Sequence, residues 1–223
     1  MRKLIYIPIL HTQADMGALA EPLQTIAIQK IGREKWKSNV EAVEQFWAHI
    51  REEMLKGRLP FPRVRLYQDG LPVCTREADI VGDLARAGSP NHQLLVELIA
   101  RGATLMGTES PDLLLEEYNL VQRVCTARDL EEASRIKEQQ RILGQSLLQR
   151  RDQYIAARIN DTLRIGETGI LFLGMLHSPL RWLASDIRVT YPICRLSSEK
   201  VRVPSNQKRR QPHGKPHHGP DCG

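Results

Sequence analysis

Short apolar runs alternate with amphipathic stretches along most of this chain, and this alternation constrains the fold more than any other feature. The runs are LIYIPIL (4–10), RVRLYQDG (63–70), ATLMG (103–107), TGILFLGMLH (168–177) and DIRVTYPI (186–193). Short apolar runs bounded by turn residues predict buried strands. Strands that alternate with helices predict an α/β fold, a mostly parallel central sheet flanked by helices.

Helical patterns fill the segments between the predicted strands. The apolar spacing predicts helices at about 19–31, 37–56, 76–87, 91–101, 110–124 and 178–185. Residues 128–163 are interpreted as one long helix before the last core strands, with Gly144 as its kink. Ser-Pro pairs at Ser89, Ser110 and Ser178 predict helix starts, because serine caps free amides and proline suits the first turn.

Residues 197–223 differ in composition from the rest of the chain. They hold six of the 32 Lys and Arg residues against two acidic ones, are rich in Pro, Gly and His, and lack hydrophobic periodicity. The predicted organisation is a single α/β domain over 1–196 and a disordered basic tail over 197–223. The near-neutral body argues against a dedicated nucleic-acid-binding fold, whereas the tail could make a weak, salt-sensitive contact with nucleic acid or protein.

No apolar run approaches the roughly 20 residues that span a bilayer, so neither a transmembrane segment nor a membrane partner is expected. Arg2 and Lys3 before the first run resemble a signal peptide, but Pro8 and His11 interrupt that run, and we interpret it as a strand. The cysteines have no CxxC spacing and indicate a reduced, cytoplasmic protein; they are Cys74, Cys125, Cys194 and Cys222.

Polar side chains follow the predicted strands where each of them ends. They are His11, Gln68, Asp69, Thr108, Glu109 and His177, and Ser178 follows directly. The carboxyl ends of parallel strands meet at one edge of a sheet, where functional groups gather. We therefore predict His11, Glu109 and His177 as catalytic residues at one crevice, with Asp69, Thr108 and Ser178 as substrate-binding residues.

Two histidines with nearby carboxylates are compatible with two chemistries. They could hold a divalent metal ion that lowers the pKa of a bound water. Alternatively, a neutral imidazole could act as general base on water, with a carboxylate fixing its tautomer. HExxH and CxxC zinc signatures are lacking, so no cofactor is certain and a divalent metal stays open. A purely structural role, as hydrogen-bonded strand ends and turn caps, also stays open.

The order of four motifs resembles the TraB, Tiki and erythromycin-esterase-like group of α/β proteins. The motifs are PILH (8–11), GTE (107–109), RRDQYIAARINDTL (150–163) and GMLH (174–177). In that group, GxxH motifs close an early and a late strand, an acidic residue follows another strand, and an arginine-bearing helix precedes the last core strand. The resemblance favours Arg151 as a fourth catalytic residue. Pro8 replaces the first motif's glycine, and Gln68-Asp69 stands where the group has a glutamate, which favours esterase-like chemistry over the metal-dependent protease activity of Tiki-like members.

The sequence thus predicts a hydrolase that activates water on an unknown ester or amide of a small molecule or peptide. One histidine would activate the water, Glu109 would orient it, and Arg151 would stabilise developing negative charge. For Arg150 and Arg151, solvated positions on the helix are equally compatible with the pattern. The alternative function is a non-catalytic binding or regulatory protein that holds an anionic small molecule in the same crevice. His92 is predicted at the surface and His49 as partly buried; the oligomeric state is not predicted.

Overall fold

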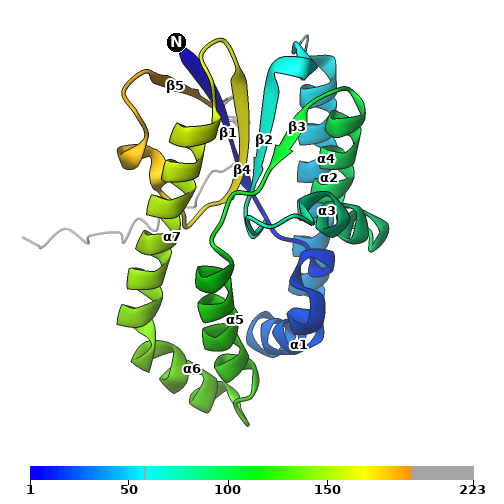
Figure 1. Cartoon of the computed structure of the whole chain (residues 1–223). Coiled ribbons are helices and arrows are strands. Elements are labelled where there is room, and N and C mark those ends of the chain that lie inside the picture. The colour runs from blue at the N-terminus through cyan, green and yellow to red at the C-terminus, as the bar shows by residue number, and fades with distance from the viewer. Residues whose placement is uncertain (58, 192–223) are drawn as a thin grey trace, which may run out of the picture. The chain divides into compact units, whose positions relative to one another are not determined.

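The computed structural model describes residues 1–57 and 59–191 and contains one parallel sheet. Its strands run in the order β3-β2-β4-β1-β5, and every neighbouring pair is parallel (Figure 1). They are β1 (Arg2–Ile9), β2 (Val64–Gln68), β3 (Thr104–Met106), β4 (Thr168–Gly174) and β5 (Ile187–Thr190). The α/β prediction is confirmed, and the predicted tail at 197–223 lies outside the described residues.

Helices cover both faces of this sheet. The helices of the described residues are α1 (Ala20–Ile31), α2 (Arg33–Lys56), α3 (Glu77–Arg86), α4 (Pro90–Ala100), α5 (Pro111–Cys125), α6 (Leu130–Gln139) and α7 (Arg141–Thr162), with short 3₁₀ segments η1 (Gln13–Leu19), η2 (Phe61–Arg63) and η3 (Pro179–Trp182). Helices α1, α5 and α6 lie beyond the end of the sheet (Figure 1). In Figure 1, α2, α3 and α4 lie on one side of the sheet and the upper half of α7 on the other. This two-sided cover explains why the central strands are apolar at successive positions.

Strand β4, at the centre of the sheet, contributes alternate residues to the hydrophobic cores on the two faces of the sheet. On β4, Ile170 and Phe172 pack with the core beneath α2, α3 and α4, whereas Leu171 and Leu173 pack beneath α7. All four of these side chains are fully buried. Because strand side chains alternate between faces, this arrangement fixes the register and holds the carboxyl ends of the strands in place.

Three boundaries predicted from the sequence are wrong. The long helix at 128–163 is two helices that divide at Gln140, whereas Gly144 lies inside α7. Residues 178–185 form only the short turn η3, because the chain must enter β5 at Ile187. Strand β4 ends at Gly174, and the backbone N–H of His177 donates to the Gly174 carbonyl (3.1 Å), so His177 lies in a turn beyond the strand.

The Ser-Pro pairs behave differently at their three positions. The Ser89 and Ser110 side chains accept hydrogen bonds from the backbone N–H groups of His92 and Leu113, so both cap helices as predicted. Ser178 makes no such bond. Its own backbone N–H instead donates to Asp152 on α7 (2.9 Å), which ties the turn after β4 to that helix.

Neither membrane-spanning character nor cysteine pairing is found in the described part of the chain. None of its helices combines the length and the apolar composition needed to cross a bilayer. Cys74 and Cys125 are free thiols, and Cys194 and Cys222 lie outside the described residues.

Candidate functional site

Asp69 occupies the centre of a buried polar cluster at the carboxyl edge of the sheet. Its Oδ2 atom accepts a hydrogen bond from the backbone N–H of Gly174 (2.8 Å) and lies 3.3 Å from Nε2 of His11. Its Oδ1 atom accepts from Nη2 of Arg151 (3.0 Å) and lies 3.7 Å from Nε2 of His177. We call this group, completed by Glu109 and Asp152, the Asp69 cluster. The structure thus brings His11, Asp69, Glu109, Arg151 and His177 together.

Two glycines allow the Asp69 carboxylate to reach its position. The backbone N–H of Asp69 donates to the Phe172 carbonyl (2.9 Å), which extends the β2–β4 pairing by one residue. Gly70 then turns the chain with a φ of 71°, a conformation that glycine adopts without strain. A Cβ atom on Gly174 would lie 2.8 Å from Asp69 Oδ2, so a side chain there would displace the carboxylate.

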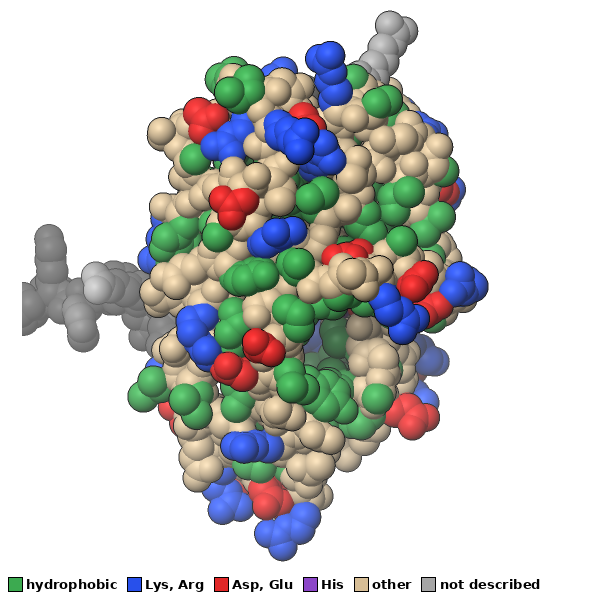
Figure 2. All heavy atoms as spheres, in the orientation of Figure 1, with side chains coloured by type: hydrophobic (Ala, Val, Ile, Leu, Met, Phe, Trp, Pro, Cys, Tyr) green, Lys and Arg blue, Asp and Glu red, His purple; other side chains and the backbone are tan. Residues whose placement is uncertain are grey.

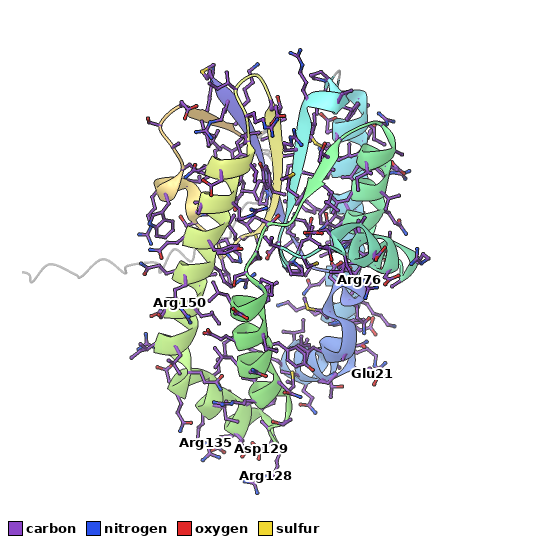
Figure 3. All side chains as sticks on the ribbon, viewed as in Figure 1. Glu21, Arg76, Arg128, Asp129, Arg135 and Arg150 are labelled. Carbon is purple, nitrogen blue, oxygen red and sulfur yellow. The ribbon has the colours of Figure 1, made fainter. Side chains whose placement is uncertain are left out.

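Arg151 is the cationic member of the Asp69 cluster. Its side chain, from α7, is only 4 % exposed. Nε and Nη2 donate to the two carboxylate oxygens of Glu109 (2.6 and 2.7 Å), and Nη1 pairs with Glu117. Arg150, labelled on α7 in Figure 3, is instead half exposed and pairs with Glu116 of α5. Of the two arginines considered from the sequence, Arg151 therefore belongs to the cluster, and its guanidinium is engaged by carboxylates.

Glu109 and Thr108 hold the loop after β3 against the loop after β2. Glu109 Oε1 accepts from the backbone N–H of Gly70 (2.7 Å), and Glu109 is completely buried. Thr108 Oγ1 accepts from the backbone N–H of Gln68 (2.9 Å) and is also completely buried. A Cβ atom on Gly107 would lie 2.7 Å from the Val73 Cα atom, so the two loops approach closely. Neither side chain is exposed to a substrate.

His177 is held by a carboxylate that the sequence reasoning missed. Nδ1 of His177 lies 2.6 Å from Oδ1 of Asp152, and both side chains are about 5 % exposed. Asp152 follows Arg151 directly, so α7 delivers a cation and an anion to the same cluster. The sequence signal for this residue is the RRD motif, which places a carboxylate directly after Arg151. Ser178 contributes its backbone N–H to Asp152 rather than its hydroxyl to the site.

His11 is the accessible member of the Asp69 cluster. The Trp47 indole N–H donates to the carbonyl of Leu10 (3.0 Å), which fixes the backbone just before His11. The His11 side chain is 36 % exposed, and it lines a cavity of about 480 Å³. Its Nδ1 atom has no hydrogen-bond partner among the residues that the structure describes. His11 therefore joins the buried carboxylate to a cavity that no sequence pattern predicted.

The charges of the Asp69 cluster shift the pKa values of its members. Although burial alone would raise the pKa of Asp69, the hydrogen bond from His11 and the charges of His177 and Arg151 hold it below its usual range. The Asp69 hydrogen bond raises the pKa of His11. Burial lowers the pKa of His177, but the Asp152 hydrogen bond and the Asp69 charge outweigh this effect and raise it. Burial raises the pKa of Glu109, against the opposing effect of Arg151.

A second carboxylate–histidine group, the Asp15 cluster, lies between η1 and the start of α4. Ser89 Oγ donates to Asp15 Oδ1 (2.5 Å), and Nδ1 of His92 lies 2.7 Å from Ser89 Oγ and 3.2 Å from Asp15 Oδ1. Thr12 donates its backbone N–H to Asp15 Oδ2 (2.6 Å). The surface position predicted for His92 is wrong, because the Ser89 cap turns it inward and leaves it 5 % exposed. His49 is half-buried, as predicted.

The Asp15 cluster lacks the geometry of a catalytic triad. In a triad the carboxylate and the hydroxyl contact different ring nitrogens of the histidine. Here both contact Nδ1 of His92, and Ser89 is fully buried. The cluster therefore anchors η1 to α4.

Asp69, Glu109 and His177 offer the ligand types found in metal sites. One ligand atom from each lies within 4.8 Å of the other two. The pairing of His177 with Asp152 also resembles the outer partner of a metal-bound histidine. However, Arg151 donates to both oxygens of Glu109 and to Asp69, so a divalent ion would share these carboxylates with a guanidinium. The donor set fits a metal-free acid–base site better than a metal centre.

No protein-family model, no curated protein and no solved structure matches this chain. The resemblance to the TraB, Tiki and erythromycin-esterase-like group therefore stays a prediction from motif order. What can be said of function depends on the geometry of the Asp69 cluster and the cavity beside it.

Proposed function

We propose that the protein is a hydrolase in which His11 is the general base for attack of water on an ester or amide. The observation that carries this proposal is the position of His11. Its Nε2 atom lies 3.3 Å from the buried Asp69 carboxylate, and the residue also lines the cavity. A histidine oriented by a carboxylate on one side and open to a ligand on the other is the usual general-base arrangement.

The proposed reaction begins with a water molecule between the free Nδ1 of His11 and the substrate carbonyl carbon. His11 accepts one proton from the water as the new carbon–oxygen bond forms. The bond from the carbonyl carbon to the leaving alcohol or amine then breaks, and the imidazolium returns the proton to that leaving group. Ester or amide plus water gives acid plus alcohol or amine, and the enzyme is unchanged.

The other members of the Asp69 cluster act as positioning residues in this proposal. Asp69 holds the His11 tautomer with Nε2–H toward the carboxylate and stabilises the imidazolium. Arg151 and Glu109 hold Asp69 in place, because their donors and acceptors are directed at each other and at the loop after β2. This differs from the roles expected from the sequence, in which Glu109 oriented water and Arg151 met the substrate.

The alternative, a non-catalytic protein that holds an anion, receives less support. The Arg151 guanidinium is 4 % exposed and already paired with Glu109, Asp69 and Glu117. An anion in the crevice would instead lie near the buried carboxylates of Asp69 and Asp152. The same motifs that resemble the TraB, Tiki and esterase-like group supply His11, Glu109, Arg151 and His177, which supports a hydrolase of that kind.

Hydrolysis of p-nitrophenyl esters by wild type, His11→Gln and His49→Gln tests the proposal. His49 lies on α2 outside the cavity wall and is the matched control. We expect His11→Gln to lower kcat by about 10²–10⁴-fold, the range for loss of a general base, and His49→Gln to leave it unchanged. In the wild type, kcat/KM should rise with pH through a midpoint above the ordinary histidine value of 6.5. Equal rates for the two variants, or no turnover by the wild type, would exclude the proposal.

A further inference from the structure

The cavity beside His11 has walls that are mostly apolar. Most wall residues come from η1, α1 and α2, and Gly88 and Pro90 add to them from the start of α4. The apolar ones include Met16, Leu23, Ala27, Trp36, Val40 and Val43. Figure 2 shows a hollow lined by hydrophobic side chains on the molecular face that carries α1 and α5. The volume of about 480 Å³ lies in the range of small-molecule sites.

The chain itself does not complete the packing of these walls. Helix α1 has four apolar residues in the stretch LQTIAI at 23–28, yet none of the helix residues is buried. Leu23, Ala27, Val40 and Val43 are only partly covered where they face the cavity. An apolar ligand would remove this surface from water and gain free energy in proportion to the area covered.

The polar groups at the cavity select the kind of ligand. Gln13, Gln24, Asn39 and Glu44 line it, and no lysine or arginine is found among its described lining residues. Gln13 donates to Gln24, which joins η1 to α1 across the wall. A strongly anionic ligand would therefore find an acidic side chain and no fixed cation, whereas a neutral molecule with one polar group has His11 as its partner.

We propose that this cavity holds the aliphatic acyl chain of a neutral ester, with the ester carbonyl placed beside His11. This inference rests on the proposed hydrolase function and names its substrate class. The volume of about 480 Å³ favours a single flexible chain over a protein segment, because it is the size of a small-molecule site. Continuity with His11 places the reacting carbonyl at the end of the cavity nearest to Asp69.

Two assays on the full-length protein test the inference separately from the proposed function. The first measures kcat/KM for p-nitrophenyl esters from acetate to dodecanoate. Each added methylene should raise kcat/KM about fourfold until the cavity is full. The second measures binding of alkyl methyl ketones of matching length by calorimetry, which needs no turnover. Both kcat/KM in the first assay and the affinity for the ketone in the second should rise with chain length.

Ala27→Phe fills part of the cavity, and Ala48→Phe makes the same change on an exposed position of α2 outside the cavity wall. We expect Ala27→Phe to shift the optimum to shorter chains, and Ala48→Phe to leave the chain-length profile and the rate with acetate unchanged. Ala20→Leu, a smaller change in the same wall, serves if Ala27→Phe does not fold.

The outcomes separate the two proposals. Ketone binding that depends on chain length and on Ala27, with no ester turnover, supports the acyl-chain site and excludes the hydrolase. Ester turnover that does not depend on chain length supports the hydrolase and overturns the acyl-chain site. The same holds if both cavity variants keep the wild-type dependence of kcat/KM on chain length. Absence of both turnover and ketone binding overturns both.

Discussion

The Asp69 and Asp15 clusters contain similar groups in different surroundings. Each has a buried carboxylate in contact with histidine near the carboxyl edge of the sheet. In the Asp15 cluster, one ring nitrogen of His92 contacts both Ser89 and Asp15, and these three side chains are buried. In the Asp69 cluster, the carboxylate lies between two histidines, and one of them reaches a cavity. The comparison shows that residue type does not separate an anchor from a candidate site, whereas access to one ring nitrogen does.

The largest expected effect comes from Arg151, which the Asp69 cluster has and the Asp15 cluster lacks. Arg151→Met leaves Glu109 and Asp69 buried without their cation. Loss of one partner from a buried ion pair costs about 3–5 kcal/mol, so we expect a loss of this size in the free energy of unfolding. Urea denaturation followed by circular dichroism measures it.

Arg150→Met is the matched control for that measurement. Arg150 pairs with Glu116 at half-exposed positions, and such pairs contribute about 1 kcal/mol or less. Similar losses for the two variants would show that the Arg151 network does not support the site.

A smaller effect is expected when the Asp15 cluster is broken. Ser89→Ala removes a helix cap and leaves Asp15 and His92 without their shared hydroxyl, at a cost of about 1–3 kcal/mol. Ser110→Ala removes only a cap, at α5, so the difference between the two unfolding free energies isolates the buried hydrogen bonds. Esterase activity on p-nitrophenyl acetate should be unchanged in both. A loss of activity specific to Ser89→Ala would mean that the Asp15 cluster is part of the catalytic apparatus.

The smallest expected effect is a graded dependence of stability on pH. The pKa values of His11 and His177 are raised above 6.5, so their stabilisation is complete below that value and is lost as pH rises through the raised values. The pKa of Asp69 is lowered from 3.8, so its contribution is present above that pH and is lost below it. The combined contribution of His11, His177 and Asp69 should therefore be largest between about pH 3.8 and 6.5.

Unfolding free energies of wild type, His11→Gln and His49→Gln between pH 5 and 9 check this dependence. The decline above pH 6.5 should be weaker in His11→Gln and retained in His49→Gln. An identical decline in the two variants would show that His11 is not its source.

The sheet and the edge that carries the Asp69 cluster could be predicted because they depend on local patterns. Apolar runs of strand length ended by polar residues predict both the parallel sheet and the edge where His11, Asp69, Glu109 and His177 meet. The break at Gln140 could not be found, because Gln140 and Arg141 are good helix formers and the apolar spacing continues across them.

Other parts of the site depend on contacts between distant segments. The cavity forms only when η1, α1 and α2 pack together, and no single pattern in these segments reports its size. The buried position of His92 depends in part on its contact with Asp15, which is 77 residues earlier in the chain. Only the folded chain brings these two residues together. Asp152 could have been predicted because it directly follows Arg151. However, a carboxylate on an exposed helix face gives the same sequence pattern.

The strand order has a consequence for how the protein folds during synthesis. Strand β4 lies between β1 and β2, so the segments that carry His11 and Asp69 have no common sheet until residues 168–174 are available. Pairing over such sequence separations is slow, because the intervening chain must be ordered before the contacts form. A nascent chain that stops short of β4 already holds His11, Asp69, Glu109 and Arg151, but it cannot yet assemble them. The edges of β1 and β2 stay unpaired over that interval and are the points at which this chain is most exposed to aggregation.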